Sequence, residues 1–238
     1  MSQVSQPGGV RLLLPEQLML LAFGPWNGQL RVGMRLRPYL ETALAGAVLT
    51  ELALRGSIAV EPRPGPARKF GVRVTASPPG EPFLDAVTAR VRAEKPRMLG
   101  WWIRKGMPGM YRLMLDRLTV AGLVTTTHAV VRRRSRLAWP QARADVFAQV
   151  QQVLLADPAR VASMWTADPR SASLASLAFS CRVLEVGWLP RDQRRPARAN
   201  LRAIRATDPI GQAVFDIIAE TRRTQDTISR SYIFTPTS

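Results

Sequence analysis

The chain has 238 residues, 46% of them hydrophobic and 21% charged, a composition typical of a folded protein that buries a sizeable core. Its formal net charge of +17 comes from 34 basic residues, only three of them lysine, against 17 acidic ones. One cysteine excludes an internal disulfide framework, and no run of 18 apolar residues occurs that could cross a bilayer. A positive field attracts phosphate on nucleic acid or lipid. The codon bias of a GC-rich genome would also produce this excess of arginine without selection for binding.

The amino-terminal half is expected to combine helices with two hairpins. Residues 1–10 are rich in Ser, Gln, Gly and Pro and lack a basic segment before an apolar one, so the sequence predicts a tail and no secretory signal. Helical spacing of apolar residues, with Pro or Gly near the ends, predicts helices over 12–23, 38–54, 81–93, 97–105 and 111–121. Strand-like segments predict hairpins over 57–75 and 123–139, the second with the basic run 132–136 at its tip.

The carboxy-terminal half, from Pro140, is predicted to be entirely helical. Aspartate accepts hydrogen bonds from the free amides of a first turn, and proline at the next position needs no donor. Three Asp-Pro pairs therefore predict helix starts at Asp157, Asp168 and Asp208. Residues 224–238 have no clear period and are expected to form a loose tail.

Residues for catalysis are sparse. The one histidine, His128, lies in a predicted strand, so His-His metal sites and Ser-His pairs have little to draw on. Cys181 lies in an apolar helix predicted over 174–186 and is interpreted as a core residue. No Gly-rich phosphate loop and no carboxylate pair at catalytic spacing occur. The sequence therefore predicts a protein that is not an enzyme and that holds no metal or cofactor.

Arginine and tryptophan are concentrated between Trp101 and Trp139. Arginine binds phosphate in bidentate fashion, and tryptophan is favoured at a membrane–water interface. The alternative is that Trp101 and Trp102 pack in the core while the arginines are only solvated. A second arginine series, 191–205, has helical spacing and would line one solvated face.

A winged-helix nucleic-acid binder is the alternative from another class. Arg112 and Arg117 would then face the groove, and the 132–136 run would hold phosphate. Against it, the candidate recognition helix YRLMLDRLTVA is apolar on most faces and lacks Asn, Gln and Ser to read base edges. A protein adaptor without affinity for vesicles or DNA is a further alternative.

Several segments together resemble the Golgi phosphoprotein 3 family, from about Leu12 to Arg223. They are LLLPEQLMLLAF, ALAGAVLTELALRGSI, PPGEPFLDAVTARV, KPRMLGWWIRK, DRLTVAGLV and the hairpin ending LAWP, with ELALRG the most specific. The resemblance implies a mainly α fold: a central helical bundle surrounded by amphipathic helices, with short β-hairpins. It also implies peripheral membrane binding through a phosphoinositide headgroup of the phosphatidylinositol 4-phosphate type, and adaptor roles for membrane proteins.

The chain departs from the family pattern where eukaryotic relatives hold the headgroup. Leu36 stands at the family's tryptophan and Ala45 at its first arginine, while only Arg112 is basic in the stretch aligned with its helix arginines. The hairpin tip is arginine-rich where eukaryotic members are apolar. These departures favour a looser electrostatic mode in which exposed arginines bind anionic lipid in general.

The sequence thus predicts a tail (1–10), one Golgi phosphoprotein 3-like domain (11–223) and a loose tail (224–238). The expected protein is cytoplasmic and peripherally membrane-associated, and binds anionic lipid, with membrane-protein clients and self-association through hairpin 124–139 as further partners. Its expected lipid-binding residues are Arg35, Arg37, Arg112, Arg132, Arg133, Arg134, Arg136 and Trp139.

Overall fold

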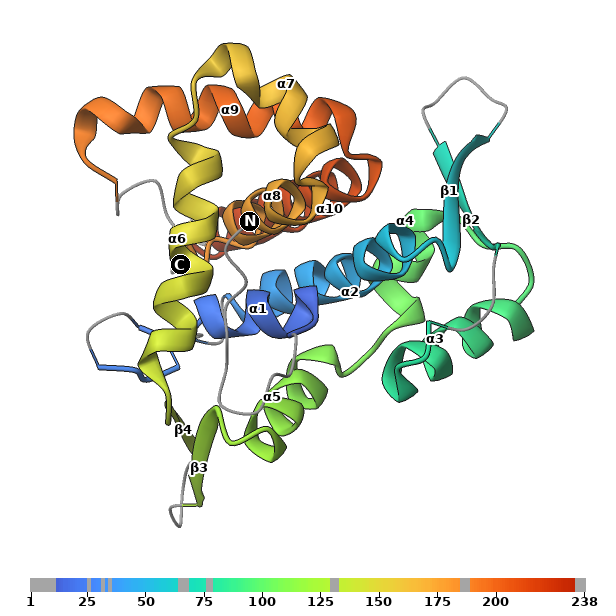
Figure 1. Ribbon diagram of the computed structural model, residues 1–238, viewed down its shortest axis with the longest axis horizontal. Coiled ribbons are helices and arrows are strands. Elements are labelled where there is room, and N and C mark those ends of the chain that lie inside the picture. The colour runs from blue at the N-terminus through green and yellow to red at the C-terminus, as the bar shows by residue number, and fades with distance from the viewer. Residues whose placement is uncertain are drawn as a thin grey trace, which may run out of the picture.

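A computed structural model describes residues 12–24, 27–30, 33, 36–63, 69–75, 79–128, 133–184 and 189–233 (Figure 1). This part of the chain is mainly helical and carries two small antiparallel sheets of two strands each. The expected fold class is therefore confirmed. The amino-terminal tail predicted over residues 1–10 lies outside the described residues.

The elements follow one another with short connections. The first half contains α1 (Leu14–Leu21), α2 (Arg37–Leu54), β1 (Ile58–Arg63), β2 (Lys69–Val74), α3 (Pro82–Ala93), α4 (Leu99–Trp101), the π-helix η1 (Trp102–Gly106) and α5 (Met110–Val120). The second half contains β3 (Val124–His128), β4 (Arg133–Leu137), α6 (Pro140–Leu154), α7 (Pro158–Ala167), α8 (Pro169–Ser180), the 3-10 turn η3 (Arg191–Gln193), α9 (Arg194–Thr207) and α10 (Pro209–Ile233).

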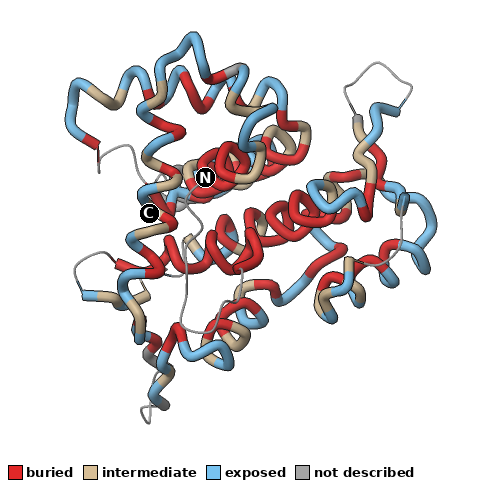
Figure 2. The backbone as a smooth tube through the Cα atoms, viewed as in Figure 1, coloured by how far each residue is buried: buried red, intermediate tan, exposed pale blue. Residues whose placement is uncertain are grey.

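Helix α2 forms the centre of the core. It contacts α1, α5, α8 and α10, and its residues from Ala43 to Leu52 are all buried. Figure 2 shows that residues along nearly the whole of α2 and α8 are buried. Gly46 lets α10 approach closely, because a Cβ at this position would lie 2.4 Å from the Val214 side chain.

The three Asp-Pro pairs start helices as predicted. Asp157 accepts a hydrogen bond from the Ala159 amide at 2.9 Å, and Asp168 accepts one from Ser171 at 3.1 Å. Asp208 is buried and accepts from the amides of Ile210 and Gly211 at 3.0 and 2.9 Å. The last of these helices, α10, runs to Ile233, so residues 224–233 are helical and the loose tail predicted from residue 224 is wrong for them.

The predicted second hairpin forms, but the basic run is placed differently. Strands β3 and β4 pair in the register Val124↔Leu137, Thr126↔Ser135 and His128↔Arg133. Arg133, Arg134 and Arg136 therefore belong to a strand, not to the turn, and only Arg132 precedes it, outside the described residues. Ser135 and Leu137 pack inward, which gives this arginine-rich segment the alternation of a strand.

A buried ion pair joins the two halves of the chain. The carboxylate of Glu51 accepts from the Leu14 amide at 2.8 Å, from Arg170 Nη1 at 2.7 Å and from Arg55 Nε at 2.8 Å. Arg170 also donates through Nη2 to the Leu12 carbonyl at 2.8 Å. Glu51 belongs to the segment ELALRG, which therefore has a structural role in this chain.

Two other expectations need correction at element boundaries. The helix predicted over 97–105 is a single α-turn followed by a π-helix, in which Trp102 packs directly against Gly106. The apolar segment around Cys181 leaves the helix earlier than predicted, because α8 ends at Ser180 and Arg182 adopts a left-handed conformation with φ of 63°. Cys181 itself is fully buried, as predicted.

Candidate functional site

The structure describes some of the expected lipid-binding residues and not others. Arg35 and Arg132 lie outside the described residues, and the backbone of Arg133 and Arg134 is described as part of β4. Arg37, Arg112 and Arg136 are described and exposed, whereas Trp139 is half-buried at the start of α6. These four residues come from the starts of α2, α5 and α6 and from β4.

The amino-terminal ends of α2 and α5 meet around Tyr111. The Arg37 guanidinium lies over the Tyr111 ring, 4.8 Å from its centroid, and Glu41 Oε2 accepts a hydrogen bond from the Tyr111 amide at 2.9 Å. The side chain of the next residue, Arg112, is 78% exposed, and its Nε lies 3.9 Å from Asp116 Oδ2. A single long contact to an exposed carboxylate leaves Arg112 able to meet an external anion.

The base of the β3–β4 hairpin is tied to the body by an extra stretch of chain. Leu137 donates its amide to the Gly28 carbonyl at 2.8 Å, and Leu30 donates to the Ser135 carbonyl at 3.3 Å. Gln29 and Arg136 thus pair as an antiparallel bridge, which lays segment 27–30 along the outer edge of β4. The hairpin projects beyond the helical body next to α5 (Figure 1).

An apolar side chain accompanies these arginines at the end of α5. Val120, the last residue of the helix, is 91% exposed, and Leu113 on the same outward side is 38% exposed. Sequence periodicity could not single out Val120, since an apolar residue at the end of an amphipathic helix is usually buried. The structure thus places an exposed aliphatic group close to the hairpin, at the end of the helix that carries Arg112.

Arg117 does not belong to this exposed surface. Its guanidinium donates to Glu16 at 2.8 Å and to Glu81 at 3.0 Å, and lies over the Phe83 ring. Partial burial opposes its charge, but the two carboxylates outweigh that effect and raise the Arg117 pKa. The groove-facing role that the winged-helix alternative gives Arg117 therefore conflicts with its place between α1, α3 and α5.

The tryptophan pair is split between core and surface. Trp102 is 1% exposed and lies in the core, whereas Trp101 is half-buried, with the Arg97 guanidinium 4.8 Å from its ring centroid. The second arginine series lies on α9, where Arg195, Arg198 and Arg202 are exposed and Arg205 stacks on Phe215. Helix α9 thus presents the solvated arginine face that its spacing predicted.

The described residues contain neither a cluster of metal ligands nor a helix that could span a membrane. They contain no group of three or more His, Cys, Asp or Glu side chains placed to hold a metal ion. None of the described helices is both long and apolar enough to cross a membrane.

The family model for Golgi phosphoprotein 3 (GPP34) matches residues 14–221. The chain belongs to the Golgi phosphoprotein 3 family. No curated protein sequence matches the chain closely enough to add a named relative. The match runs from α1 into α10 and includes Arg37, Arg112 and Arg136, so the Golgi phosphoprotein 3 fold positions the candidate surface.

Proposed function

We propose that this protein is a non-catalytic, peripheral membrane protein of the cytoplasm that binds anionic lipid. The observation that carries the proposal is the group of exposed arginines, Arg37, Arg112 and Arg136, on adjoining elements of a protein with net charge +17. Membership of the Golgi phosphoprotein 3 family supports this function over nucleic-acid binding. Basic residues next to an anionic leaflet contribute about 1 kcal/mol each, so a few arginines suffice for reversible docking.

The headgroup proposed is a phosphorylated inositol lipid or another acidic phospholipid. Leu36 is half-buried just before α2, and Ala45 is fully buried within it. Because both side chains are apolar, neither offers a cation where eukaryotic relatives have the headgroup residues. Charge attraction through surface arginines then takes the larger share of binding. Membrane-protein clients and self-association through hairpin 124–139 belong to the same proposal.

Co-sedimentation with vesicles at physiological salt tests this function. The comparison uses neutral vesicles and vesicles of matched charge that contain phosphatidylglycerol or phosphatidylinositol 4-phosphate. We expect both anionic preparations to retain the protein and the neutral one to release it. Preference for the phosphoinositide would indicate a specific headgroup site, and binding to neither anionic vesicle would contradict the proposal.

A pair of double variants locates the docking surface. Arg112→Ser with Arg136→Ser removes one exposed charge from α5 and one from β4, while Arg195→Ser with Arg198→Ser removes two from α9, which lies at the far end of the molecule from the β3–β4 hairpin in Figure 1. We expect the first variant to lose about thirtyfold in vesicle affinity, from about 1 kcal/mol per arginine, and the second to lose much less. Equal losses would mean that net charge alone, and not this surface, determines binding.

A further inference from the structure

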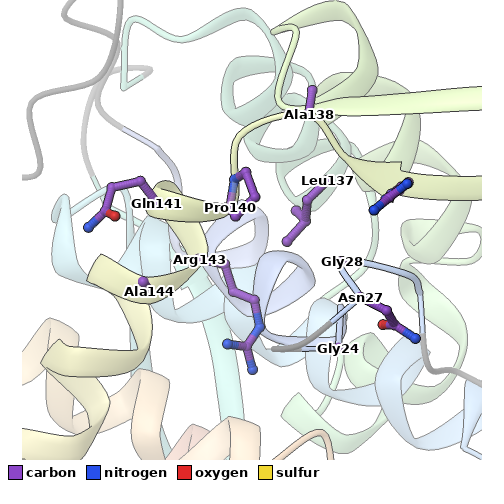
Figure 3. A pocket seen from close by; sticks show the side chains of 10 residues that line it. Gly24, Asn27, Gly28, Leu137, Ala138, Pro140, Gln141, Arg143 and Ala144 are labelled. Atoms are coloured by element: carbon purple, nitrogen blue, oxygen red, sulfur yellow. The ribbon is translucent and has the colours of Figure 1, made fainter.

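A polar hollow lies at the base of the hairpin, apart from the positions aligned with the family's headgroup residues. It has a volume of about 360 Å³, within the range of small-molecule sites, and opens between the segment after α1, the end of β4 and the first turn of α6. Figure 3 shows Arg143 reaching from α6 toward Gly24, with Asn27 on the other side of the hollow. The lining residues described are Gly24, Asn27, Gly28, Arg136, Leu137, Ala138, Pro140, Gln141, Arg143 and Ala144.

Hydrogen bonds between separate elements build the walls of this hollow. The Gly24 amide donates to the Gln29 carbonyl at 2.7 Å, which closes the loop, and Leu137 donates to Gly28 at 2.8 Å. Arg143 Nε donates to the Phe23 carbonyl at 2.7 Å and so joins α6 to the end of α1. The walls are therefore fixed before any ligand arrives, which lowers the entropic cost of binding.

The charged side chains that line the hollow have one sign, and Asp145, the nearest carboxylate along α6, is outside the lining and accepts a hydrogen bond from Gln141 at 2.8 Å. Arg136 contributes an exposed guanidinium and Arg143 one that is only 5% exposed, and the described lining includes no Asp or Glu. The first turn of the 15-residue helix α6 adds its positive dipole end, and its N-cap, Trp139, offers no side-chain acceptor to the free amides. A cation held at low dielectric acts on an anion more strongly than a solvated one.

We infer that this hollow is a phosphate-binding pocket, with room for a phosphate monoester and part of the group that carries it. Arg136 and Arg143 supply the two guanidiniums, and the first turn of α6 supplies amide donors. The phosphate could belong to a membrane lipid, in which case the pocket is the headgroup subsite of the function proposed above, or to a soluble phosphate ester.

A negative charge introduced at the rim tests the pocket without disturbing its walls. Ala144 lines the hollow and is exposed, so Ala144→Glu adds a carboxylate there at a helix position that favours glutamate. Ala148, one turn further along α6, is also exposed but does not line the hollow, so Ala148→Glu is the matched control. Substitution of Arg143 is avoided because its bond to Phe23 holds α6 in place.

The readout is calorimetric titration with inorganic phosphate and with glycerol 3-phosphate at constant ionic strength. We expect the unmodified protein and Ala148→Glu to bind equally, and Ala144→Glu to bind about tenfold more weakly. No binding by the unmodified protein, or equal binding by the two variants, would overturn the pocket.

A second arm uses vesicles that contain phosphatidic acid, and so distinguishes the source of the phosphate. If Ala144→Glu weakens both soluble-phosphate and vesicle binding relative to Ala148→Glu, the pocket takes a lipid headgroup. If it weakens only soluble-phosphate binding, the pocket takes a soluble ester. Phosphate binding without any vesicle binding would refute the membrane function and leave the pocket standing.

Discussion

Glu51 and Arg170 are charged residues whose role is in the core. Burial alone would raise the pKa of Glu51, but Arg170, the Leu14 amide and Arg55 together outweigh burial and lower it. In this chain the carboxylate of the ELALRG segment therefore fixes the start of α1 against α8. A motif can identify a family without contributing to its binding site.

Glu51→Gln should destabilise the protein by about 3 kcal/mol, because it leaves the Arg170 charge without its carboxylate in a buried site. Urea unfolding monitored by circular dichroism measures the change. Glu61→Gln is the control: Glu61 pairs with Arg73 on the exposed face of β1 and β2, and we expect little change. Equal stability of both variants would show that the ion pair between Glu51 and Arg170, here called the clamp, contributes nothing to stability.

The same carboxylate predicts a pH dependence at acid pH. Its folded-state pKa lies below the ordinary value of 4.5, so the stabilisation is present above that pH and is lost as the pH falls through the lowered pKa. Denaturation midpoints measured from pH 7 down to pH 3 should fall steadily for the unmodified protein. Glu51→Gln should show a flatter profile, and parallel profiles would contradict the assignment.

The thiol of Cys181 should be inert in the folded protein. Complete burial raises its pKa to about 12, so almost no thiolate exists at pH 8. We expect no labelling by a thiol reagent in native buffer and one equivalent after denaturation in urea. Rapid native labelling would mean that this end of α8 opens readily.

At the scale of elements, helices whose ends carry a local signal could be predicted from the sequence. Asp157, Asp168 and Asp208 started helices because a capping bond involves only neighbouring residues. The placement of the arginine run required tertiary information, since β4 owes its extent to pairing with β3 and with segment 27–30. The same holds for Arg143, whose role in the candidate pocket depends on a contact 120 residues away.

Replacing the capping aspartates by alanine should lower the stability of the protein to different degrees. Asp157→Ala removes an exposed cap and should cost about 1 kcal/mol, the usual value for such a change. Asp208→Ala should cost more, about 2–3 kcal/mol, because the amides of Ile210 and Gly211 are buried and water cannot replace the lost acceptor. Thermal unfolding of both variants measures the order, and the reverse order would refute the argument.

At the scale of the whole molecule, the dominant property is an excess of positive charge spread over several elements. Exposed arginines lie on α5, β4 and α9, so any anionic surface is attracted from several directions. The fold could be predicted from the sequence largely because the family resemblance covered nearly the whole chain. The exposed arginines of the proposed docking surface were among the residues predicted from the sequence, whereas the pairing of Arg117 and the strand position of the hairpin arginines depend on tertiary contacts.

Vesicle binding should weaken steeply with salt. Screening shortens to about 8 Å at physiological ionic strength and to about 3 Å at 1 M, so attraction through exposed arginines fades across this range. Co-sedimentation with phosphatidylglycerol vesicles over roughly one decade of NaCl concentration, from about 50 to about 500 mM, measures the effect. Binding that persisted unchanged would indicate that Val120 and other apolar contacts dominate instead.

The clamp between Glu51 and Arg170 also sets an order of events during synthesis. Arg170 lies 119 residues after Glu51 and 158 after Leu12, yet bonds to both. Contacts of such sequence separation form late, and domains larger than about 100 residues commonly fold through intermediates. Until α8 leaves the ribosome, the Glu51 carboxylate therefore has Arg55 and the Leu14 amide as partners but lacks Arg170, and a chaperone would meet the chain in that unfinished form.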